Sequence, residues 1–315
     1  MTVANIRLGY SPVMETVVWL TTAATGGRHP VFGDPGSLAR NALGLPDVDL
    51  LTDLLALTGQ YYIPDMLTPQ PRPLPPEEVL DAQLADLAAL PQELVAEQLR
   101  YVEEHWGSPV STRVRRLADT GQLTRRLADG LGTFFRHALA EGWPGLRAVA
   151  EADLTDRARV LATQGVGGLL GTLSPLVSWN GEAVVLDKPW AAEVDVSGHG
   201  IVLSAQVLGW PKLSVQADVK SQIAVYYPAA RIGLRGRRDP AELARVVGST
   251  RAALLADLGE PRSTAELAVR HDLAAATVSY HLGALRKASL VTATRDGRFV
   301  LYQRSAQAEA LLAAS

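Results

Sequence analysis

The sequence predicts an α+β fold that is mainly α-helical, with small β elements. Apolar residues recur with helical spacing through about the first 175 residues. Short alternating segments between turn residues replace this pattern at about 176–227. Helical spacing then returns, and a hairpin pattern follows it. We therefore expect a helical N-terminal body, a β-rich middle segment and a small C-terminal unit of short helices with a hairpin.

The helical body begins with a short strand at Asn5–Gly9 and a helix that Ser11 caps and Pro12 opens. A second helix is expected at Asp47–Leu57. Six prolines make Pro64–Pro76 a loop, because proline lacks the backbone N–H that regular structure needs. Further helical patterns occupy residues 77–90, 92–106, 111–140 and 144–173.

The β-rich segment contains two turn signals. Leu176–Trp179 and Ala183–Leu186 flank Asn180-Gly181, a dipeptide that favours a two-residue hairpin. A second turn at Gly198-His199-Gly200 lies between two further strand candidates, and one more strand is expected near the end of the segment. These three strands are Ala191–Val196, Ile201–Ala205 and Gln222–Tyr227.

Composition excludes several classes of protein. The chain has 315 residues, 47% of them hydrophobic, which is enough for two globular domains. It has no cysteine, which excludes disulfides, thiolate metal sites and cysteine nucleophiles and is consistent with a cytoplasmic location. No signal peptide is expected. The uncharged stretch 160–181 is long enough to span a membrane, but Pro175 and several polar residues favour a buried helix end and strand.

Charge divides the chain at about residue 230. Residues 1–230 hold 17 Lys and Arg against 25 Asp and Glu, a net charge of −8. Residues 231–315 hold 13 against 8, a net charge of +5, and begin with a basic connector. We expect these two ranges to be the two domains. The basic end is the part suited to a polyanion.

A helix-turn-helix pattern lies within the basic part. Ser263 and Glu266 form a capping-box pattern before a short helix at Thr264–Arg270. A second helix is expected from about Ala275 to Ala288, after a tight turn. Its apolar positions Val278, Leu282 and Leu285 share one face, so the opposite face and the flanks are free to contact a ligand. These carry Thr277, Ser279, Tyr280, His281, Arg286 and Lys287.

Two alternating segments after this helix flank Asp296-Gly297, a hairpin signal. Arg295 and Arg298 lie on either side of the turn. Together with the two helices, the hairpin predicts a winged helix-turn-helix. In such a domain small and polar residues of the second helix read bases in the major groove, while basic residues contact phosphates or the minor groove.

Three segments resemble the winged helix of ArsR-type transcriptional regulators: Thr264-Ala-Glu-Leu-Ala, Ala276-Thr-Val-Ser-Tyr-His-Leu and Leu285-Arg-Lys-Ala-Ser-Leu-Val. The wing segment Arg295-Asp-Gly-Arg-Phe-Val-Leu-Tyr continues the resemblance, which covers roughly 240–305. Ser289 departs from the pattern, which usually has Gly there. Less specifically, the remainder resembles a long N-terminal extension of such regulators in GC-rich, actinobacteria-like bacteria. Its segments are Tyr10-Ser-Pro-Val-Met-Glu, Gly200-Ile-Val-Leu and Tyr226-Tyr-Pro-Ala.

The resemblance implies a homodimeric repressor that binds an inverted repeat of double-stranded DNA and is released by an effector. On this reading Thr277, Ser279, Tyr280 and His281 read bases. Phosphates or the minor groove are contacted by Arg286, Lys287, Arg295 and Arg298. We expect neither an enzyme nor a cofactor. A metal effector is not expected either, because cysteine is absent and the six histidines form no ligand pair.

The large body suggests a sensor for an uncharged, apolar small molecule. Aromatic residues of the helical body are candidates for its pocket, although core packing also accounts for them: Trp106, Phe134, Phe135 and Trp143. Two alternatives stay open, a partner protein in place of the small molecule and an enzyme that carries a winged helix. The basic groups Arg113-Val-Arg-Arg and Arg125-Arg126 fit solvated helix faces, carboxylate pairing or a second nucleic-acid contact.

Overall fold

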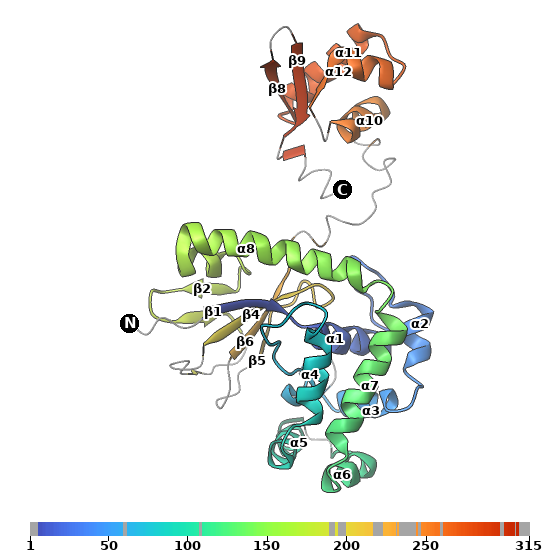
Figure 1. The fold of residues 1–315 in the computed structure, drawn as a ribbon, viewed down its shortest axis with the longest axis vertical. Coiled ribbons are helices and arrows are strands. Elements are labelled where there is room, and N and C mark those ends of the chain that lie inside the picture. Colours follow the sequence, from blue (N-terminus) through green and yellow to red (C-terminus); the bar gives the residue numbers. More distant parts are fainter. Residues whose placement is uncertain are drawn as a thin grey trace. The chain divides into compact units, whose positions relative to one another are not determined.

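The computed structural model describes residues 6–58, 62–106, 109–188, 193–194, 200–216, 223–230, 232, 244, 247–258, 261–296, 299–305 and 307–308. The fold is α+β, mainly helical with small sheets, as the sequence predicts (Figure 1). The chain divides into two compact units, residues 1–230 and residues 231–315, which we call the larger and the smaller unit.

The larger unit begins with strand β1 (Ile6–Tyr10) and continues through a series of helices. Two connections are long: the loop from α1 to α2, and the proline-rich segment, which holds a single turn of 3-10 helix at Asp65–Leu67. The helices are α1 (Pro12–Ala24), α2 (Gly36–Ala42), α3 (Val48–Ala56), α4 (Val79–Ala88), α5 (Gln92–Trp106), α6 (Thr112–Asp119), α7 (Leu123–Ala138) and α8 (Trp143–Gly171).

The described residues that follow form a hairpin and a four-stranded sheet. Strands β2 (Val177–Trp179) and β3 (Val184–Leu186) form the predicted antiparallel hairpin around Asn180-Gly181. The other sheet has the order β1-β4-β6-β5 and also contains the N-terminal strand. Its first three strands are parallel, and β5 is antiparallel to β6. The bounds are β4 (Ile201–Gln206), β5 (Ser214–Gln216) and β6 (Ile223–Pro228).

The four-stranded sheet is covered on both faces. Tyr10, Ala205 and Tyr227 share one row of the register, on the face along which α8 runs (Figure 1). The Tyr10 ring lies 6.2 Å from that of Trp143, and the Arg157 guanidinium lies over the Tyr227 ring. On the other face Met14 of α1 packs with Val202, Ala224 and Tyr226. Burial on both faces is typical of parallel strands.

The start of α1 is tied to the loop after β4. Ser11 caps the helix by accepting a hydrogen bond from the Met14 backbone N–H at 3.0 Å. One turn in, the buried Glu15 carboxylate accepts from the backbone N–H groups of Val207, at 2.5 Å, and Leu208, at 2.7 Å. Burial raises the pKa of Glu15 to about 7, although both hydrogen bonds act in the opposite direction.

The main core of the larger unit lies where α1, α3, α4 and α7 meet. Leu20, Leu54, Leu127 and Phe134 are fully buried in it. Removing such side chains from water is the main favourable term in folding, about 25 cal/mol per Å² of apolar surface. Helix α7 packs closely against the residue that precedes α3, because Gly130 faces the Asp47 carbonyl without a side chain. A Cβ added at Gly130 would lie 2.4 Å from that oxygen.

Several boundaries differ from the sequence prediction. The expected helix at 111–140 is two helices, α6 and α7, because Gly121 between them has φ +70°. The expected helix at 144–173 is α8, in which Gly165 departs from helical geometry with φ +71°. Helix α2 and strand β5 were not expected. Strand β4 is paired by β1 and β6 on its two edges. A further strand was expected at 191–196. Most of that segment lies outside the described residues.

In the described residues of the smaller unit, helices α10, α11 and α12 accompany a sheet of order β7-β9-β8. Its elements are α10 (Ser249–Asp257), β7 (Arg262–Ser263), α11 (Thr264–Arg270), α12 (Ala275–Lys287), β8 (Val291–Asp296) and β9 (Phe299–Arg304). In neither unit is a described helix long and apolar enough to cross a membrane.

Candidate nucleic-acid interface

A compact apolar core positions the helices of the smaller unit. Leu254 of α10, Leu258 directly after it, Leu267 of α11 and Val291 of β8 pack around the buried face of α12. That face is formed by Val278, Leu282 and Leu285, the three residues that the spacing predicts. The apolar core therefore fixes which side of α12 faces inward, and the residues on its opposite side stay exposed.

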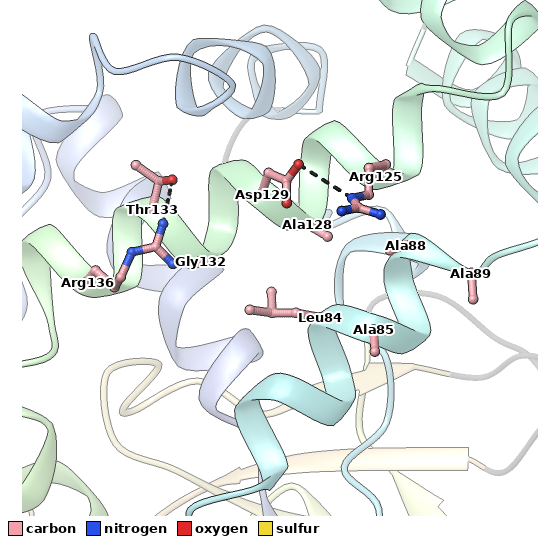
Figure 2. Close-up of a pocket in the computed structure, with 10 residues that line it drawn as sticks. All are labelled: Leu84, Ala85, Ala88, Ala89, Arg125, Ala128, Asp129, Gly132, Thr133 and Arg136. Atoms are coloured by element: carbon pink, nitrogen blue, oxygen red, sulfur yellow. Dashed lines mark hydrogen bonds and ion pairs between the residues drawn. The ribbon is translucent and has the colours of Figure 1, made fainter.

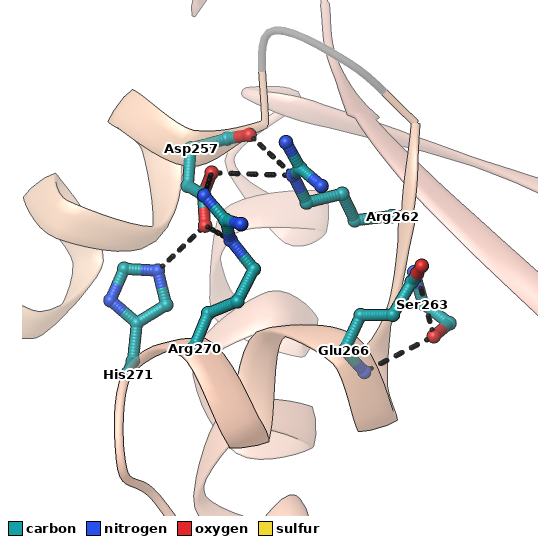
Figure 3. A network of polar contacts seen from close by, with 6 residues as sticks. All are labelled: Asp257, Arg262, Ser263, Glu266, Arg270 and His271. Atoms are coloured by element: carbon teal, nitrogen blue, oxygen red, sulfur yellow. Dashed lines mark hydrogen bonds and ion pairs between the residues drawn. The ribbon is translucent and has the colours of Figure 1, made fainter.

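A network around Asp257 joins α10 to α11 and β7 (Figure 3). The carboxylate accepts two hydrogen bonds from Arg270, at 2.6 and 2.9 Å, and pairs with Arg262 at 3.2 Å. His271 lies 3.1 Å away, at the end of α11. The hydrogen bond from Arg270 and the neighbouring positive charges hold the pKa of Asp257 below its usual range. Sequence analysis missed this network, because no local pattern brings these four residues together.

Local signals set both the start of α11 and the tight turn that leads from α11 to α12. Ser263 accepts from the Glu266 backbone N–H at 3.2 Å, and Glu266 accepts from the Ser263 backbone N–H at 2.7 Å. This capping box confirms the predicted start of α11 (Figure 3). Asp272 takes a left-handed conformation with φ +50°, which turns the chain into α12. Aspartate tolerates that conformation better than most residues.

The exposed surface of α12 carries most of the predicted contact residues. Thr277, Ser279, Arg286 and Lys287 are exposed. The Tyr280 side chain is 68% exposed although it is large and partly apolar. We call the surface formed by these five residues the α12 face. It is polar through the first half of the helix and basic at the end.

His281 differs from the prediction of an open base-reading residue. It is half-buried, and its ring lies edge-on to the Tyr280 ring with centroids 5.4 Å apart. Its Nδ1 atom is buried and has no hydrogen-bond partner among the described residues. Only part of this imidazole is therefore available to a ligand.

Ser289, which stands where the resembled pattern usually has glycine, lies just after the end of α12. Ser289 has φ +59°, in the left-handed region where glycine is favoured. The Leu290 N–H donates to the Leu285 carbonyl at 2.9 Å, which closes the helix. Serine here occupies a position whose backbone conformation favours glycine.

Strands β8 and β9 form the wing as an antiparallel hairpin. Arg295 is exposed on β8, and its register partner Val300 is 42% exposed. The other predicted wing arginine, Arg298, lies outside the described residues. The wing thus presents at least one cation beside an apolar side chain.

The aromatic candidates of the larger unit are packed together. Phe134 is fully buried, and Phe135 lies edge-on to Trp143 at 5.3 Å. The side chain of Trp106 lies outside the described part of the chain. Phe134, Phe135 and Trp143 line neither of the two hollows described below. The geometry of these three side chains is that of core packing.

One of these hollows is a groove of about 680 Å³ between α4 and α7 (Figure 2). Its floor is made of small residues such as Ala88 and Gly132. The charged side chains at its rim have partners on α7 itself: Arg125 pairs with Asp129 at 3.7 Å, and Arg136 donates to the Thr133 hydroxyl at 3.0 Å. The groove is therefore apolar, with a self-paired rim.

The basic groups of the body bind carboxylates. Arg113 pairs with Asp49 at 2.7 Å and Arg126 with Asp47 at 2.6 Å, and Arg115 pairs with Glu103. This favours carboxylate pairing among the three readings of these residues. Among the described residues, no group of three potential metal ligands occurs.

The geometry of the smaller unit is that of a winged helix-turn-helix, and the comparison with known families agrees. Residues 249–293, from α10 into β8, match a family described as a helix-turn-helix domain. Residues 112–233 match a family of unknown function, DUF5937. No curated protein and no solved structure matches the chain. The helix-turn-helix match points to a DNA-binding regulator rather than an enzyme.

Proposed function

We propose that this protein is an ArsR-type transcriptional repressor that binds an inverted repeat of double-stranded DNA as a homodimer. The observation that carries the proposal is the division of α12, whose apolar side is fully buried while its polar and basic α12 face is open. An exposed tyrosine beside hydroxyl and basic side chains is unusual on a helix that serves only as a support.

In this proposal α12 lies in the major groove. The hydroxyl groups of Thr277, Ser279 and Tyr280 bond base edges there, and the accessible part of His281 contributes at the flank. Arg286 and Lys287 neutralise phosphates, while Arg295 and Arg298 of the wing contact the backbone or the minor groove. A two-fold dimer would present two α12 helices to half-sites about 34 Å apart.

The charge distribution supports placing the DNA contact in the smaller unit. The smaller unit carries +5 and the larger unit −8, so DNA is attracted to the winged helix and repelled by the rest. The larger unit contains far more structure than a winged helix needs. We propose that it binds a small-molecule effector that lowers DNA affinity, in a protein that works in the cytoplasm.

The test compares substitutions on the α12 face with a matched control. Binding to promoter fragments from the protein's own genomic neighbourhood is measured by fluorescence anisotropy at several salt concentrations. Arg286→Ala should weaken binding to every sequence and reduce the salt slope by about one, because one phosphate contact is lost. Ser279→Ala should instead change the base preference at one position of each half-site. Arg100→Ala, at an exposed position of α5, should leave both quantities unchanged.

The proposal is wrong if Arg286→Ala and Ser279→Ala bind every fragment as Arg100→Ala does. The dimer is tested separately by light scattering of the protein with and without DNA. A single monomer on each operator would overturn the two-fold arrangement while leaving the role of α12 in place.

A further inference from the structure

The second hollow of the larger unit has the size of a small-molecule site. Its volume is about 660 Å³, and such sites commonly enclose 300–1,000 Å³. It lies between the start of β1, the proline-rich segment and the region where α4 is followed by α5. Much of the lining is apolar, with Met66, Pro71, Leu90 and Leu94 among its residues.

One cation in this hollow has no counter-charge. Arg7 of β1 is half-buried and lines the hollow. Among the residues that the structure describes, none forms a hydrogen bond or ion pair with its guanidinium. Burial lowers the pKa of Arg7, and no neighbouring carboxylate offsets that effect. A guanidinium held at an apolar wall without a partner is costly unless water or a ligand compensates it.

The other charged groups of the hollow are already engaged. Arg72 forms an ion pair with Asp86, so these two side chains neutralise each other. Asp65 lies close to two buried tyrosines. Burial is the main cause of the raised pKa values of Tyr62 and Tyr226, and the negative charge of Asp65 raises both further. A ligand would therefore meet one available cation, the carboxylate of Asp65, which disfavours a dianion, and largely apolar walls.

We propose that this hollow binds a small organic acid through its single carboxylate. The carboxylate pairs with the Arg7 guanidinium, whose planar donors suit two parallel hydrogen bonds. The apolar body of the acid contacts the proline-rich segment and the leucines that follow it. This inference rests on the proposed function, because it assigns the effector a chemical class and a site. It replaces the uncharged effector of the sequence analysis with a monoanion.

The test measures binding by the full-length protein in isothermal titration calorimetry. The probes are octanoate and phenylacetate, each compared with its neutral primary amide. We expect at least one acid to bind, and to bind at least tenfold more tightly than its amide. Arg7→Gln should abolish this preference. Arg7→Lys should restore part of it, since lysine keeps the charge but not the planar donors.

Arg100→Gln serves as the control, because Arg100 is exposed on α5 and lies away from the hollow. It should bind both acids as the unmodified protein does. Circular dichroism of Arg7→Gln checks that the fold is intact, and Arg7→Lys keeps the test decisive if it is not. Equal affinity for acids and amides, no binding of either acid at millimolar concentration, or binding indifferent to Arg7 would overturn the proposal.

DNA affinity is measured separately with the same acid. If the acid binds through Arg7 and weakens DNA binding, the site and its regulatory role both hold. Arg7-dependent binding without any change in DNA affinity supports the ligand site and overturns the effector role. If the protein binds no DNA at all, the proposed function fails, while the calorimetry still decides whether the site exists.

Discussion

At the scale of single residues, Glu15 links two distant parts of the larger unit. Its carboxylate joins the first turn of α1 to the loop after β4. Because it is buried, the folded protein binds its proton more tightly than the unfolded chain, whose glutamate has a pKa of about 4.5. Raising the pH from 4.5 through 7 therefore favours the unfolded state, and this loss of stability is complete above pH 7.

We predict that Glu15→Gln removes this loss. The free energy of unfolding of the unmodified protein should fall by about 3 kcal/mol more than that of the variant between pH 4.5 and pH 7.5. Urea unfolding followed by tryptophan fluorescence measures it, since all six tryptophans lie in residues 1–230. Identical pH profiles for the two proteins would contradict the prediction.

The residues of the α12 face were predictable because helical spacing alone decides which side chains face the core. Val278, Leu282 and Leu285 are buried as that spacing requires. The half-burial of His281 was not predictable, because helical spacing places this residue at the edge between the buried and exposed sides. Asp257 and Arg7 were missed for a different reason. Their surroundings are assembled from segments far apart in the chain, and neither carries a local motif.

At the scale of elements, the ends of helices and strands were predictable where a cap or a turn dipeptide marks them. Caps located the starts of α1 and α11. The turn dipeptides located both hairpins but not their exact loops, because Trp179 pairs with Val184 across a four-residue loop and Asp296 is itself paired with Phe299. The parallel sheet was not foreseen, because alternation marks a strand but does not identify its neighbours. The division between α6 and α7 was missed because both helices are apolar on one face, and the three residues between them carry a single strong turn signal, the left-handed Gly121.

The packing of α7 on Asp47 yields an element-scale prediction. Gly130→Ala should destabilise the larger unit by about 1–3 kcal/mol, because the new methyl group collides with the Asp47 carbonyl, which is backbone. Gly171→Ala is the matched control, since a Cβ there meets nothing within 4 Å. It should be neutral or slightly stabilising. Urea unfolding by tryptophan fluorescence compares them, and equal midpoints would contradict the proposed close approach.

At the scale of the whole molecule, charge separates the two units more clearly than fold does. The sequence shows this asymmetry directly, but it does not show whether basic pairs in the acidic body are available to DNA. The structure places Arg113, Arg115 and Arg126 against carboxylates. DNA binding is therefore expected to depend on the smaller unit alone.

Arg126→Ala tests this expectation. DNA affinity and its salt slope should match those of the unmodified protein, because Arg126 is paired with Asp47. Loss of this partly exposed pair should lower the free energy of unfolding of the larger unit by up to about 1 kcal/mol. A loss of DNA affinity comparable with that of Arg286→Ala would instead show a second DNA contact on the body.

The pairing of β1 with β4 also sets the order in which the chain can fold. Ile6 is the register partner of Ile201, so the first strand is synthesised 195 residues before the strand that it needs. Such long-range pairing slows folding, because a long loop must close before any contact rewards it. The core of the smaller unit, by contrast, draws on residues between Leu254 and Ala308. On a ribosome, β1 must therefore remain unpaired until most of the larger unit has been synthesised.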